Sequence, residues 1–305
     1  MLSLRVAMRN VPYAMRIHDA LRRKRAQVTD DQLAKVICER YFHSTGMTLD
    51  LENPQTYNEK LQWMKVYWRD ERVPICVDKY RVREYVKAKG LEHILIDLIG
   101  VYERVSQIDF DTLPQKFVLK ANHGSGWNIL CEDKDKLDRR ATRLLLDRWL
   151  HDNYYYHGYE WVYKDIRPAI VCEAFLEDTS EGGLKDYKIF CFDGAPRLIQ
   201  VDIDRAQNHR RNIYDLNWNY VPVSIKYPTD PGFKVEKPSR LEEMLDYARV
   251  LSQDFPHVRV DFYQHEERVY FGELTFIHGS GYEKFTPPEY GKQLGDWFTL
   301  PKEEK

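Results

Sequence analysis

The segment from Arg259 to Gly281 reads RVDFYQHEERVYFGELTFIHGSG, and it decides how we interpret the fold. Two acids, Asp261 and Glu273, each lie in an apolar run typical of a strand, and the polar turn at 264–268 predicts that these runs pair as a hairpin. This pairing would direct both carboxylates to one place. Hard oxygen ligands suit Mg²⁺ that carries nucleotide phosphates, because the ion takes only one or two carboxylates from the protein. On these residues alone, two solvent-facing acids in an ordinary hairpin are the alternative.

A second segment, KFVLKANHGSGWN at 116–128, supplies a cation and a glycine-rich turn. The apolar run 117–119 is typical of a buried strand, and it ends on Lys120. An ammonium and several backbone N–H groups would then face the same space, as in a phosphate-binding loop. The lysine precedes the glycines, so the segment matches neither GxxxxGK[ST] nor GxGxxG. The alternative is an ordinary hairpin turn. The candidate loop residues are His123, Gly124, Ser125 and Gly126.

Composition limits the classes of function. The 305 residues are 43% hydrophobic and 31% charged, which predicts one large domain or two modest ones. A formal charge of −2 argues against general nucleic-acid binding, which needs a basic surface. The five cysteines are scattered without metal-site spacing, and this favours a reducing cytoplasm. No apolar run matches a membrane span or a signal peptide.

The first 28 residues are strongly basic. Asp19 is the one acid that precedes Thr29, whereas Arg5, Arg9, Arg16, Arg22, Arg23, Lys24 and Arg25 are interleaved with apolar residues. Such a basic amphipathic segment predicts peripheral contact with an anionic membrane surface. The alternative is a solvated helix that packs on its own domain.

The remaining pattern predicts mixed α and β structure. Helical spacing covers 30–42, 58–68, 137–153 and 239–255. Thr56 with Glu59 predicts a capping box at the second helix, and Ser239 predicts the cap of the fourth. Asp193-Gly194 predicts a tight turn between two strands. The expected strands are 94–101, 117–121, 128–131, 169–176, 187–192, 198–203 and 211–215.

The order of these features resembles the ATP-grasp superfamily. Three further motifs are similar to its TupA-like branch of teichuronopeptide biosynthesis: Pro54-x-Thr56-Tyr-Asn58-Glu-Lys60, Asp78-Lys79-Tyr80 and Leu113-Pro-x-x-Phe-Val-Leu-Lys120. The resemblance covers about Thr56 to Tyr290. It implies an α+β ATP-grasp fold in which two α+β subdomains clamp ATP, with a helical N-terminal extension. The expected regions are 1–75 (helical), 76–165 (with the glycine-rich loop) and 166–305 (with the hinge and the metal site).

The resemblance also implies roles for single residues around ATP. Lys120 would contact the α- and β-phosphates, while the loop from His123 to Trp127 would close over the β/γ end. The backbone of a hinge would read the edge of the adenine. Lys188 would be a second cation near the phosphates, with an exposed surface lysine as the alternative. The hinge residues are Glu173, Ala174, Phe175 and Leu176.

The same resemblance implies a metal site and a catalytic arginine. Asp261 and Glu273 become the Mg²⁺ ligands, and Glu273 could bridge two ions. Thr275 occupies a position where relatives commonly carry asparagine, which puts the second ion in question. Arg259 would stabilise an acyl phosphate and the tetrahedral oxyanion. A structural salt bridge from Arg259 to Asp261 is its alternative.

For the acceptor, a cationic cluster and the second glycine loop are the candidates. The candidate substrate-binding residues are Arg205, Arg210, Arg211, His278, Gly279, Ser280 and Gly281. The cluster suits a carboxylate or phosphate, although a solvated turn is the alternative. The branch implies an ADP-forming ligase that attaches an amino acid to a uronic-acid carboxylate of a cell-surface glycan or its lipid-linked precursor. One rival is an ATP-grasp kinase that phosphorylates a sugar hydroxyl, with His278 as its base. The other is a non-catalytic nucleotide-binding subunit of a glycan-assembly complex.

Overall fold

The computed structural model describes residues 27–177, 184–203 and 208–301, together with Asp19, Leu21 and Lys24. The chain divides into two compact units. Unit 1 comprises Pro74–Arg81, Ile96–Phe175 and the described residues before Asp31; unit 2 comprises Asp31–Val73, Val82–Leu95 and the described residues from Leu176 onward. These units cross the expected region boundaries, because 31–73 belongs to unit 2 rather than to a separate N-terminal region. The chain leaves unit 1 between Phe175 and Leu176, within the expected hinge.

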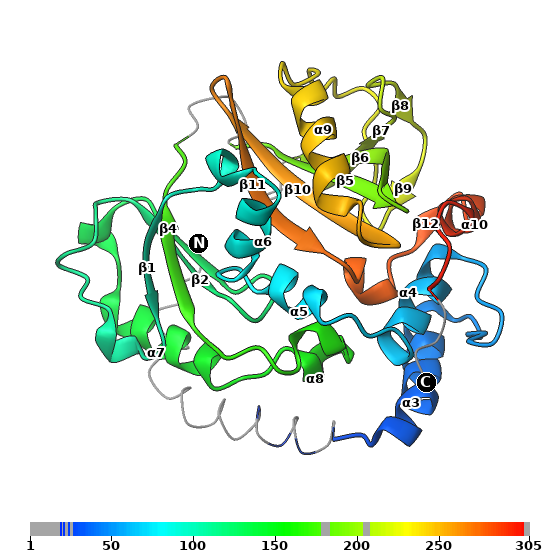
Figure 1. Cartoon of the computed structure of the whole chain (residues 1–305), viewed down its shortest axis with the longest axis horizontal. Helices are drawn as coiled ribbons and strands as arrows, with labels where there is room; N and C mark the ends of the chain where they lie inside the picture. The colour runs from blue at the N-terminus through cyan, green and yellow to red at the C-terminus, as the bar shows by residue number, and fades with distance from the viewer. Residues whose placement is uncertain are drawn as a thin grey trace. The chain divides into compact units, whose positions relative to one another are not determined.

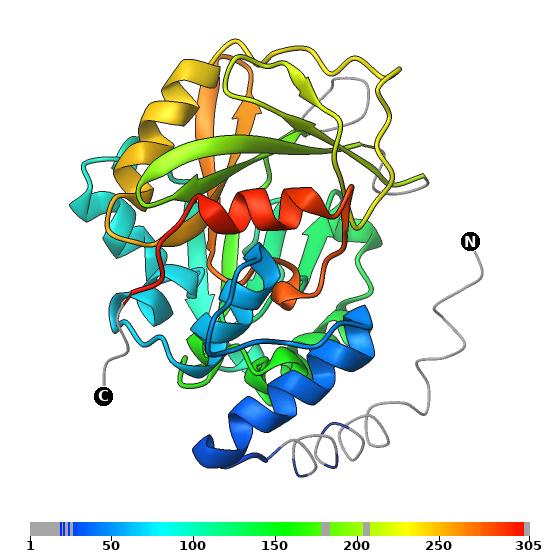
Figure 2. The same ribbon diagram turned by 90° about the vertical axis from the view of Figure 1, so that its right-hand side faces the viewer.

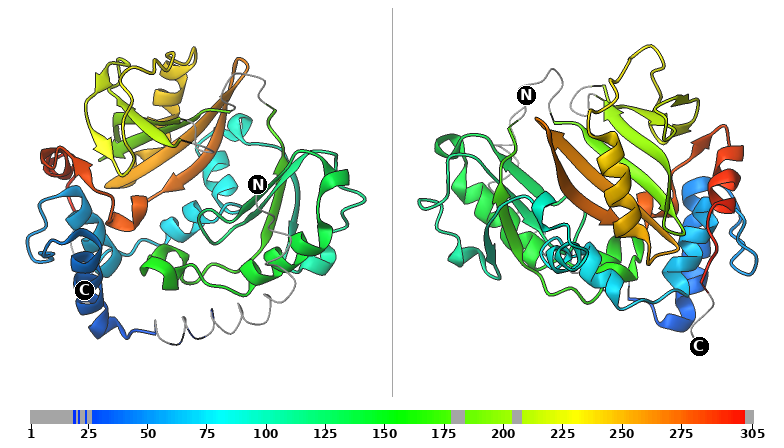
Figure 3. Two further views of the ribbon diagram at one scale, coloured as in Figure 1. Left: turned by 180° about the vertical axis from the view of Figure 1, so that it is seen from behind. Right: turned by 45° about the horizontal axis from the view of Figure 1, so that its top comes forward.

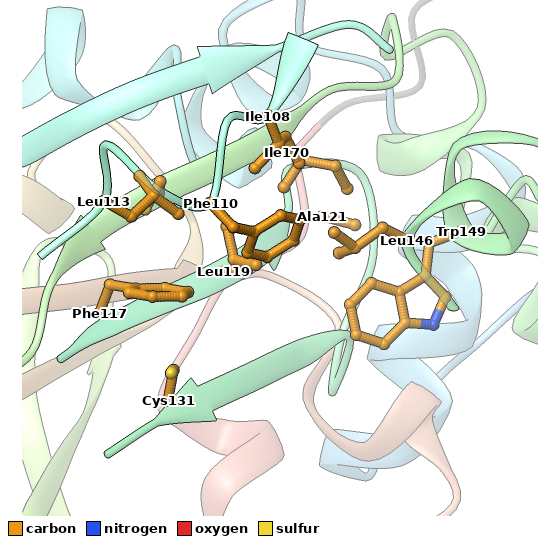
Figure 4. Packing of buried hydrophobic residues seen from close by; sticks show 11 residues of the cluster. Ile108, Phe110, Leu113, Phe117, Leu119, Ala121, Cys131, Leu146, Trp149 and Ile170 are labelled. Carbon is orange, nitrogen blue, oxygen red and sulfur yellow. The ribbon is translucent and has the colours of Figure 1, made fainter. Parts of the chain in front are cut away.

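Unit 1 is built on a four-stranded antiparallel sheet. Its strands are β1 (Leu98–Tyr102), β2 (Phe117–Ala121), β3 (Asn128–Cys131) and β4 (Ile170–Ala174), in the order β1-β4-β2-β3 (Figure 1). One face of the sheet packs against α7 (Arg139–Leu150), as Figure 4 shows for Leu146 and Trp149. The shorter elements are η2 (Val105–Gln107), η3 (Lys134–Lys136), α8 (Tyr155–Gly158) and η4 (Trp161–Tyr163).

Side chains alternate across β2, and this alternation places its lysine. Phe117, Leu119 and Ala121 are buried in the core of unit 1, together with Phe110 and Ile170 (Figure 4). Because successive residues of a strand point to opposite faces, Lys120 emerges on the face away from this core. The core therefore fixes the direction of Lys120.

Unit 2 is built on a six-stranded antiparallel sheet. The strands, in spatial order, are β11 (Arg268–Thr275), β10 (His257–His265), β5 (Asp186–Phe192), β6 (Ala195–Ile203), β7 (Arg210–Tyr214) and β8 (Tyr220–Val221). Helix α9 (Leu241–Ser252) lies along one face of this sheet (Figures 1 and 3). Its buried stripe of Leu241, Met244, Leu245, Ala248 and Leu251 makes that face apolar.

Helix α4 (Tyr57–Val66) packs near the other face, where the Tyr57 ring contacts Phe190 and Phe192. Helix α10 (Glu289–Asp296) lies beside α4 (Figure 2). The remaining elements of unit 2 are α3 (Asp30–Thr45, whose first residue falls in unit 1), α6 (Val82–Ala88), η1 (Glu92–Ile94), β9 (Ser224–Ile225), η5 (His278–Gly281) and β12 (Phe285–Thr286). Helix α5 (Arg72–Val77) begins in unit 2 and ends in unit 1.

No helix in the described part of the chain combines the length and the apolar character needed to cross a membrane.

Several local predictions are confirmed. The strands 117–121 and 128–131 pair as a hairpin around the glycine-rich loop, and β10 pairs with β11. Asp193 and Gly194 form the tight turn with φ of 48° and 75°. The capping box is present as well: Thr56 Oγ1 accepts from the Glu59 N–H at 3.4 Å, and Glu59 Oε2 accepts from the Thr56 N–H at 2.8 Å.

Two local predictions are wrong. Helix α9 begins at Leu241 with Arg240 at the cap position, and no side chain caps it. Ser239 Oγ instead accepts a hydrogen bond from Gln264 Nε2 at 2.9 Å, so a tertiary contact has taken the capping hydroxyl. The strand expected from residue 94 begins at Leu98, because Ile94 lies in the turn of 3₁₀-helix η1.

Candidate active site

In unit 1, the central feature is the pair of Lys120 and Glu173. Lys120 Nζ donates to Glu173 Oε2 at 2.6 Å, from β2 to the neighbouring strand β4. The two side chains are 18% and 9% exposed. Both emerge on the face of the sheet away from the core, since their strand neighbours Leu119 and Cys172 belong to that core. The ammonium therefore lies beside the glycine-rich loop with a carboxylate counter-ion already in place.

The glycine-rich loop is anchored through His123 and Asn122. The His123 ring is buried, with Nδ1 3.0 Å from Asn122 Oδ1 and Nε2 3.0 Å from the Trp149 carbonyl. Burial lowers the pKa of His123, so the ring is neutral. Both ring nitrogens are engaged within unit 1, which leaves the backbone N–H groups of the loop as the donors suited to a phosphate.

Lys79 and Asp78 are functional candidates that the sequence reasoning quoted as a motif without giving them a role. Lys79 Nζ donates to the Gly124 carbonyl at 2.6 Å, and its backbone N–H donates to the Asn122 carbonyl at 3.2 Å. Asp78 Oδ2 accepts from Asn122 Nδ2 at 2.9 Å. The Asp-Lys-Tyr motif thus holds the loop from a segment 44 to 45 positions earlier. Its position directly before a helix was the signal available in the sequence.

Trp127 closes the loop on its other side. Its indole packs among the rings of His123, Trp149, Tyr154 and His157, at centroid distances of 5.3 to 6.3 Å. A Cβ at Gly124 would come within 2.6 Å of the same indole, so this position needs glycine for close approach.

In the expected hinge, Glu173 and Ala174 are already paired within the sheet as part of β4. The Ala174 N–H also donates to the Asp97 carbonyl at 2.9 Å. Phe175 and Leu176 are half-buried. The role of this segment in reading adenine stays a prediction.

In unit 2, buried charges are paired across β5 and β10. Asp261 accepts from Arg259 through both oxygens, at 2.7 and 2.6 Å, and from Lys188 at 2.7 Å. Lys188 also donates to Asp186. Lys188 is buried, so the alternative of a surface lysine is wrong. The salt bridge from Arg259 to Asp261 is present as well, while a role for Arg259 in catalysis stays a prediction.

The electrostatics of this cluster favour a permanently charged arginine. Burial opposes the charge of Arg259, yet Asp261 raises the pKa of Arg259 above its ordinary value. Burial raises the pKa of Asp261 as well, against the opposing influence of Arg259 and Lys188. The two cations thus compensate a carboxylate that burial alone would neutralise.

The two predicted metal ligands are direct neighbours. Asp261 and Glu273 are paired residues of β10 and β11, which confirms the predicted hairpin. Glu273 is 37% exposed, and its Oε1 lies 3.3 Å from Thr275 Oγ1 and 3.6 Å from Arg259 Nη2. Arg259 Nη2 also donates to Thr275 Oγ1 at 3.1 Å, so the threonine hydroxyl is part of the same cluster.

These residues fit a Mg²⁺ site in part. Within the described residues, no group of three or more His, Cys, Asp or Glu side chains converges on a metal-sized point. Mg²⁺ with nucleotide phosphates needs only one or two protein carboxylates. Glu273 fits this role as a partly exposed hard oxygen donor. Asp261 lies next to it, but both its oxygens are held by cations, and a metal would compete with Arg259 and Lys188 for them.

The second glycine loop, η5, is fixed by helix α4. Lys65 Nζ donates to the Ser280 carbonyl at 2.6 Å and to Ser280 Oγ at 2.9 Å, and it lies 4.4 Å from the centre of the Tyr282 ring. Gln62 Nε2 donates to the carbonyls of Ser280 and Gly281, at 3.0 and 2.8 Å. Gly279 and Ser280 are both left-handed, with φ of 54° and 55°. The sequence reasoning missed Gln62 and Lys65, which a helical pattern reads as an exposed polar face.

The predicted cationic cluster is compensated by acids. Arg211 is buried and donates to Asp202 at 2.7 Å and to Glu283 at 3.1 Å. Arg210 pairs with Asp230. Arg205 lies outside the described residues. The described arginines of the cluster therefore hold local carboxylates, and their role in binding an anionic acceptor stays a prediction.

The family follows from the match of a sequence model to most of the chain. The model described as TupA-like ATPgrasp matches residues 59–299. This range includes Lys120 with the glycine-rich loop, the buried cluster of Lys188, Arg259 and Asp261, and η5. The chain belongs to the TupA-like ATP-grasp family. The ATP-grasp assignment and the mixed α+β fold that the sequence predicted are thereby confirmed.

Solved structures give more distant likenesses for this ATP-grasp chain. D-alanine–D-alanine ligase from Bacillus anthracis, complexed with ATP, is 17% identical over 67% of this chain and 54% of its own, with a TM-score of 0.40. The ATP-grasp ligase PsnB, complexed with Mg, ADP and a phosphomimetic variant of its minimal precursor, is 11% identical. The match covers 72% of this chain and 57% of PsnB, with a TM-score of 0.40. D-Alanine-D-alanine ligase from Helicobacter pylori is 18% identical over 82% of this chain and 70% of its own, with a TM-score of 0.41. The chain thus spans little more than half the length of the first two. The search of curated proteins found no match.

The η5 loop of this ATP-grasp protein gives a prediction about Gly281. A Cβ at Gly281 would lie 2.4 Å from Gln62 Nε2, and φ is +70°. We expect Gly281→Ala to lower the free energy of unfolding by about 1–3 kcal/mol, because left-handed strain and a clash with Gln62 add. Gly46→Ala is the matched control in unit 2, since its φ is +77° and nothing lies within 4 Å. Thermal unfolding of both variants measures the difference, and equal shifts would contradict the clash.

Proposed function

We propose that this protein is an ATP-dependent ligase that joins a carboxylate to an amine, with ADP and phosphate as products. The observation that carries the proposal is the buried Arg259–Asp261–Lys188 cluster beside the partly exposed Glu273, in a chain of the ATP-grasp family. Bound ATP would supply the phosphoryl group that activates the carboxylate, and Mg²⁺ would offset the charge of the phosphates.

The residues of each unit would have distinct tasks in this reaction. In unit 1, Lys120 and the loop N–H groups would bind phosphate oxygens. In unit 2, Glu273 would hold Mg²⁺ with Asp261 and Thr275 beside it, while Arg259 and Lys188 would stabilise the negative charge that develops on the carboxylate. The salt bridge with Asp261 keeps Arg259 protonated and orients its guanidinium toward Glu273 and Thr275.

For the substrates, we propose an amino acid as the amine and a uronic-acid carboxylate of a cell-surface glycan, or of its lipid-linked precursor, as the acceptor. The family branch supports a role in polysaccharide biosynthesis, such as that of a capsule or cell wall. The seven basic residues before Thr29 support peripheral contact with an anionic membrane surface, on the cytoplasmic side. The near-neutral net charge supports the absence of a nucleic-acid partner.

The proposal is tested by measuring ADP and free phosphate in parallel. Purified protein is given MgATP, mixed amino acids and a uronic-acid glycan fraction, with each substrate omitted in turn. We expect equal amounts of ADP and phosphate that depend on both the amino acid and the glycan, and a new amide detected by mass spectrometry. Glu273→Ala should abolish turnover, because a Mg²⁺ ligand is lost.

Other outcomes would identify the rivals. Recovery of the γ-phosphate on the glycan, with no free phosphate, would make the protein a kinase. Nucleotide binding without turnover under any substrate combination would favour a non-catalytic subunit. The exposed Lys136, paired with Asp133 on the surface of unit 1, provides the control variant Lys136→Ala, which should leave turnover unchanged.

A further inference from the structure

His278 differs from the other deeply buried histidines of the described chain. His123 has both ring nitrogens engaged, as described above. In His257, Nε2 lies 2.9 Å from the Tyr57 hydroxyl and Nδ1 lies 2.9 Å from the Cys191 carbonyl. His278 is 3% exposed, and its Nδ1 has no hydrogen-bond partner among the described residues. A buried ring nitrogen without a partner calls for a functional explanation.

The other nitrogen of His278 faces a carboxylate. Nε2 lies 3.3 Å from Glu283 Oε2. Glu283 is itself held by two cations, with Arg211 Nη1 3.1 Å from Oε2 and Lys226 Nζ 3.4 Å from Oε1. A carboxylate beside Nε2 favours the tautomer that carries the proton there, and Nδ1 then bears the lone pair. This is the arrangement of a base that an acid orients.

The backbone around this dyad is fixed as well. His278 opens the η5 turn, which Lys65 and Gln62 hold through the carbonyls of Ser280 and Gly281. Asn58 Nδ2 donates to the Glu283 carbonyl at 2.8 Å, so helix α4 fixes both members of the pair. The positions of both backbones are therefore set by one helix.

The surroundings of His278 keep its ring neutral. Burial is the main cause that lowers the pKa of His278 well below its ordinary value, followed by Arg259, Arg211, His257 and Lys188. The groups that face the ring include these four, Glu283, the edge-on ring of Phe190 and, from α4, Tyr57. A neutral imidazole can accept a proton. A bound phosphate or carboxylate would offset the nearby cations and so raise the pKa of the ring, which favours proton transfer to it.

We propose that His278 is the general base of the ligation step and that Glu283 is its positioning residue. The assignment rests on the proposed ligase function. The amine nitrogen attacks the acyl carbon, the C–N bond forms, and its proton passes to Nδ1. The C–O bond to phosphate breaks, and phosphate leaves with the electron pair. The ligand class at Nδ1 is a primary amine.

The test separates activation of the carboxylate from attack by the amine. Hydroxylamine is a nucleophile that is unprotonated at neutral pH, so it captures an acyl phosphate as a hydroxamate without needing a base. We expect His278→Gln to lower amide formation with the amino acid by about 10²–10⁴-fold, the usual contribution of a general base. Hydroxamate formation, with MgATP and the glycan fraction, should stay at the wild-type level.

Two further variants sharpen the result. Glu283→Gln should lower amide formation less than His278→Gln does, because the base remains but its tautomer is no longer fixed, and hydroxamate should again be unaffected. His93→Gln, an exposed histidine on the surface of unit 2, is the matched control and should change neither product.

Three outcomes would overturn the assignment. Equal loss of amide and hydroxamate in His278→Gln would show that the residue only supports the site. Unchanged amide formation would show that it takes no proton. If the wild type yields neither hydroxamate nor ADP, the proposed ligase function itself fails. If the wild type is active and His278→Gln is equally active, only the role of His278 fails.

Discussion

Asp261→Asn is expected to lower the free energy of unfolding of unit 2 by about 3–5 kcal/mol, the usual cost of removing one partner of a buried ion pair. Asp261 is 1% exposed and accepts three hydrogen bonds from two cations. Lys188 retains Asp186 in the variant, but Arg259 loses the bidentate partner that keeps its guanidinium compensated. Urea-induced unfolding, with hydrogen exchange of β5 and β10, measures the effect.

The neighbouring strand provides the control for this stability effect. Glu273→Gln removes a carboxylate from the paired position of β11, where 37% of the side chain is exposed. We expect its free energy of unfolding to change by less than about 1 kcal/mol, because solvent screens an exposed charge. The double variant Arg259→Gln, Asp261→Asn should regain stability relative to Asp261→Asn, since no uncompensated charge is left. A single variant as stable as the wild type would contradict the central role of Asp261.

The sequence was sufficient wherever local pattern and burial point to the same structure. Phe117, Leu119 and Ala121 alternate with Lys120, and the core of unit 1 uses this alternation as predicted. Asp193-Gly194 needs positive φ at both residues, which few other pairs allow. In these cases the residues that decide the structure lie within a few positions of one another.

The contacts that position the candidate site are of another kind. Lys65 reaches Ser280 across 215 positions, and Tyr57 reaches His257 across 200. The periodicity of α4 does not distinguish a buried lysine from an exposed one, because a helical pattern assigns either to the polar face. The wrong prediction of a cap at Ser239 has the same cause, since the hydroxyl accepts a hydrogen bond from Gln264, 25 positions away. Which acid pairs with which cation is likewise set by the register of β5, β6, β7 and β10.

Lys120→Ala is expected to lower ATP-dependent turnover by about 10²–10³-fold, the usual loss when a preorganised donor to a developing negative charge is removed. The variant loses an ammonium that β2 directs away from the core. It also removes the ammonium that lies 2.6 Å from Glu173, and this carboxylate, 9% exposed, then repels a triphosphate more strongly. The affinity for nucleotide and the rate of ADP formation should therefore both decrease.

The repulsion by Glu173 makes the prediction specific. If it contributes, the double variant Lys120→Ala, Glu173→Gln should bind nucleotide more tightly than Lys120→Ala, although it has lost two charged groups. Lys120→Arg keeps the charge and should retain the larger part of nucleotide binding. Calorimetric titration with ADP and Mg²⁺ measures the nucleotide affinity of the wild type and of these three variants. An affinity of Lys120→Ala equal to that of the wild type would remove Lys120 from the phosphate site. Lys79, which donates to the Gly124 carbonyl of the glycine-rich loop, would then be the next cation to test in unit 1.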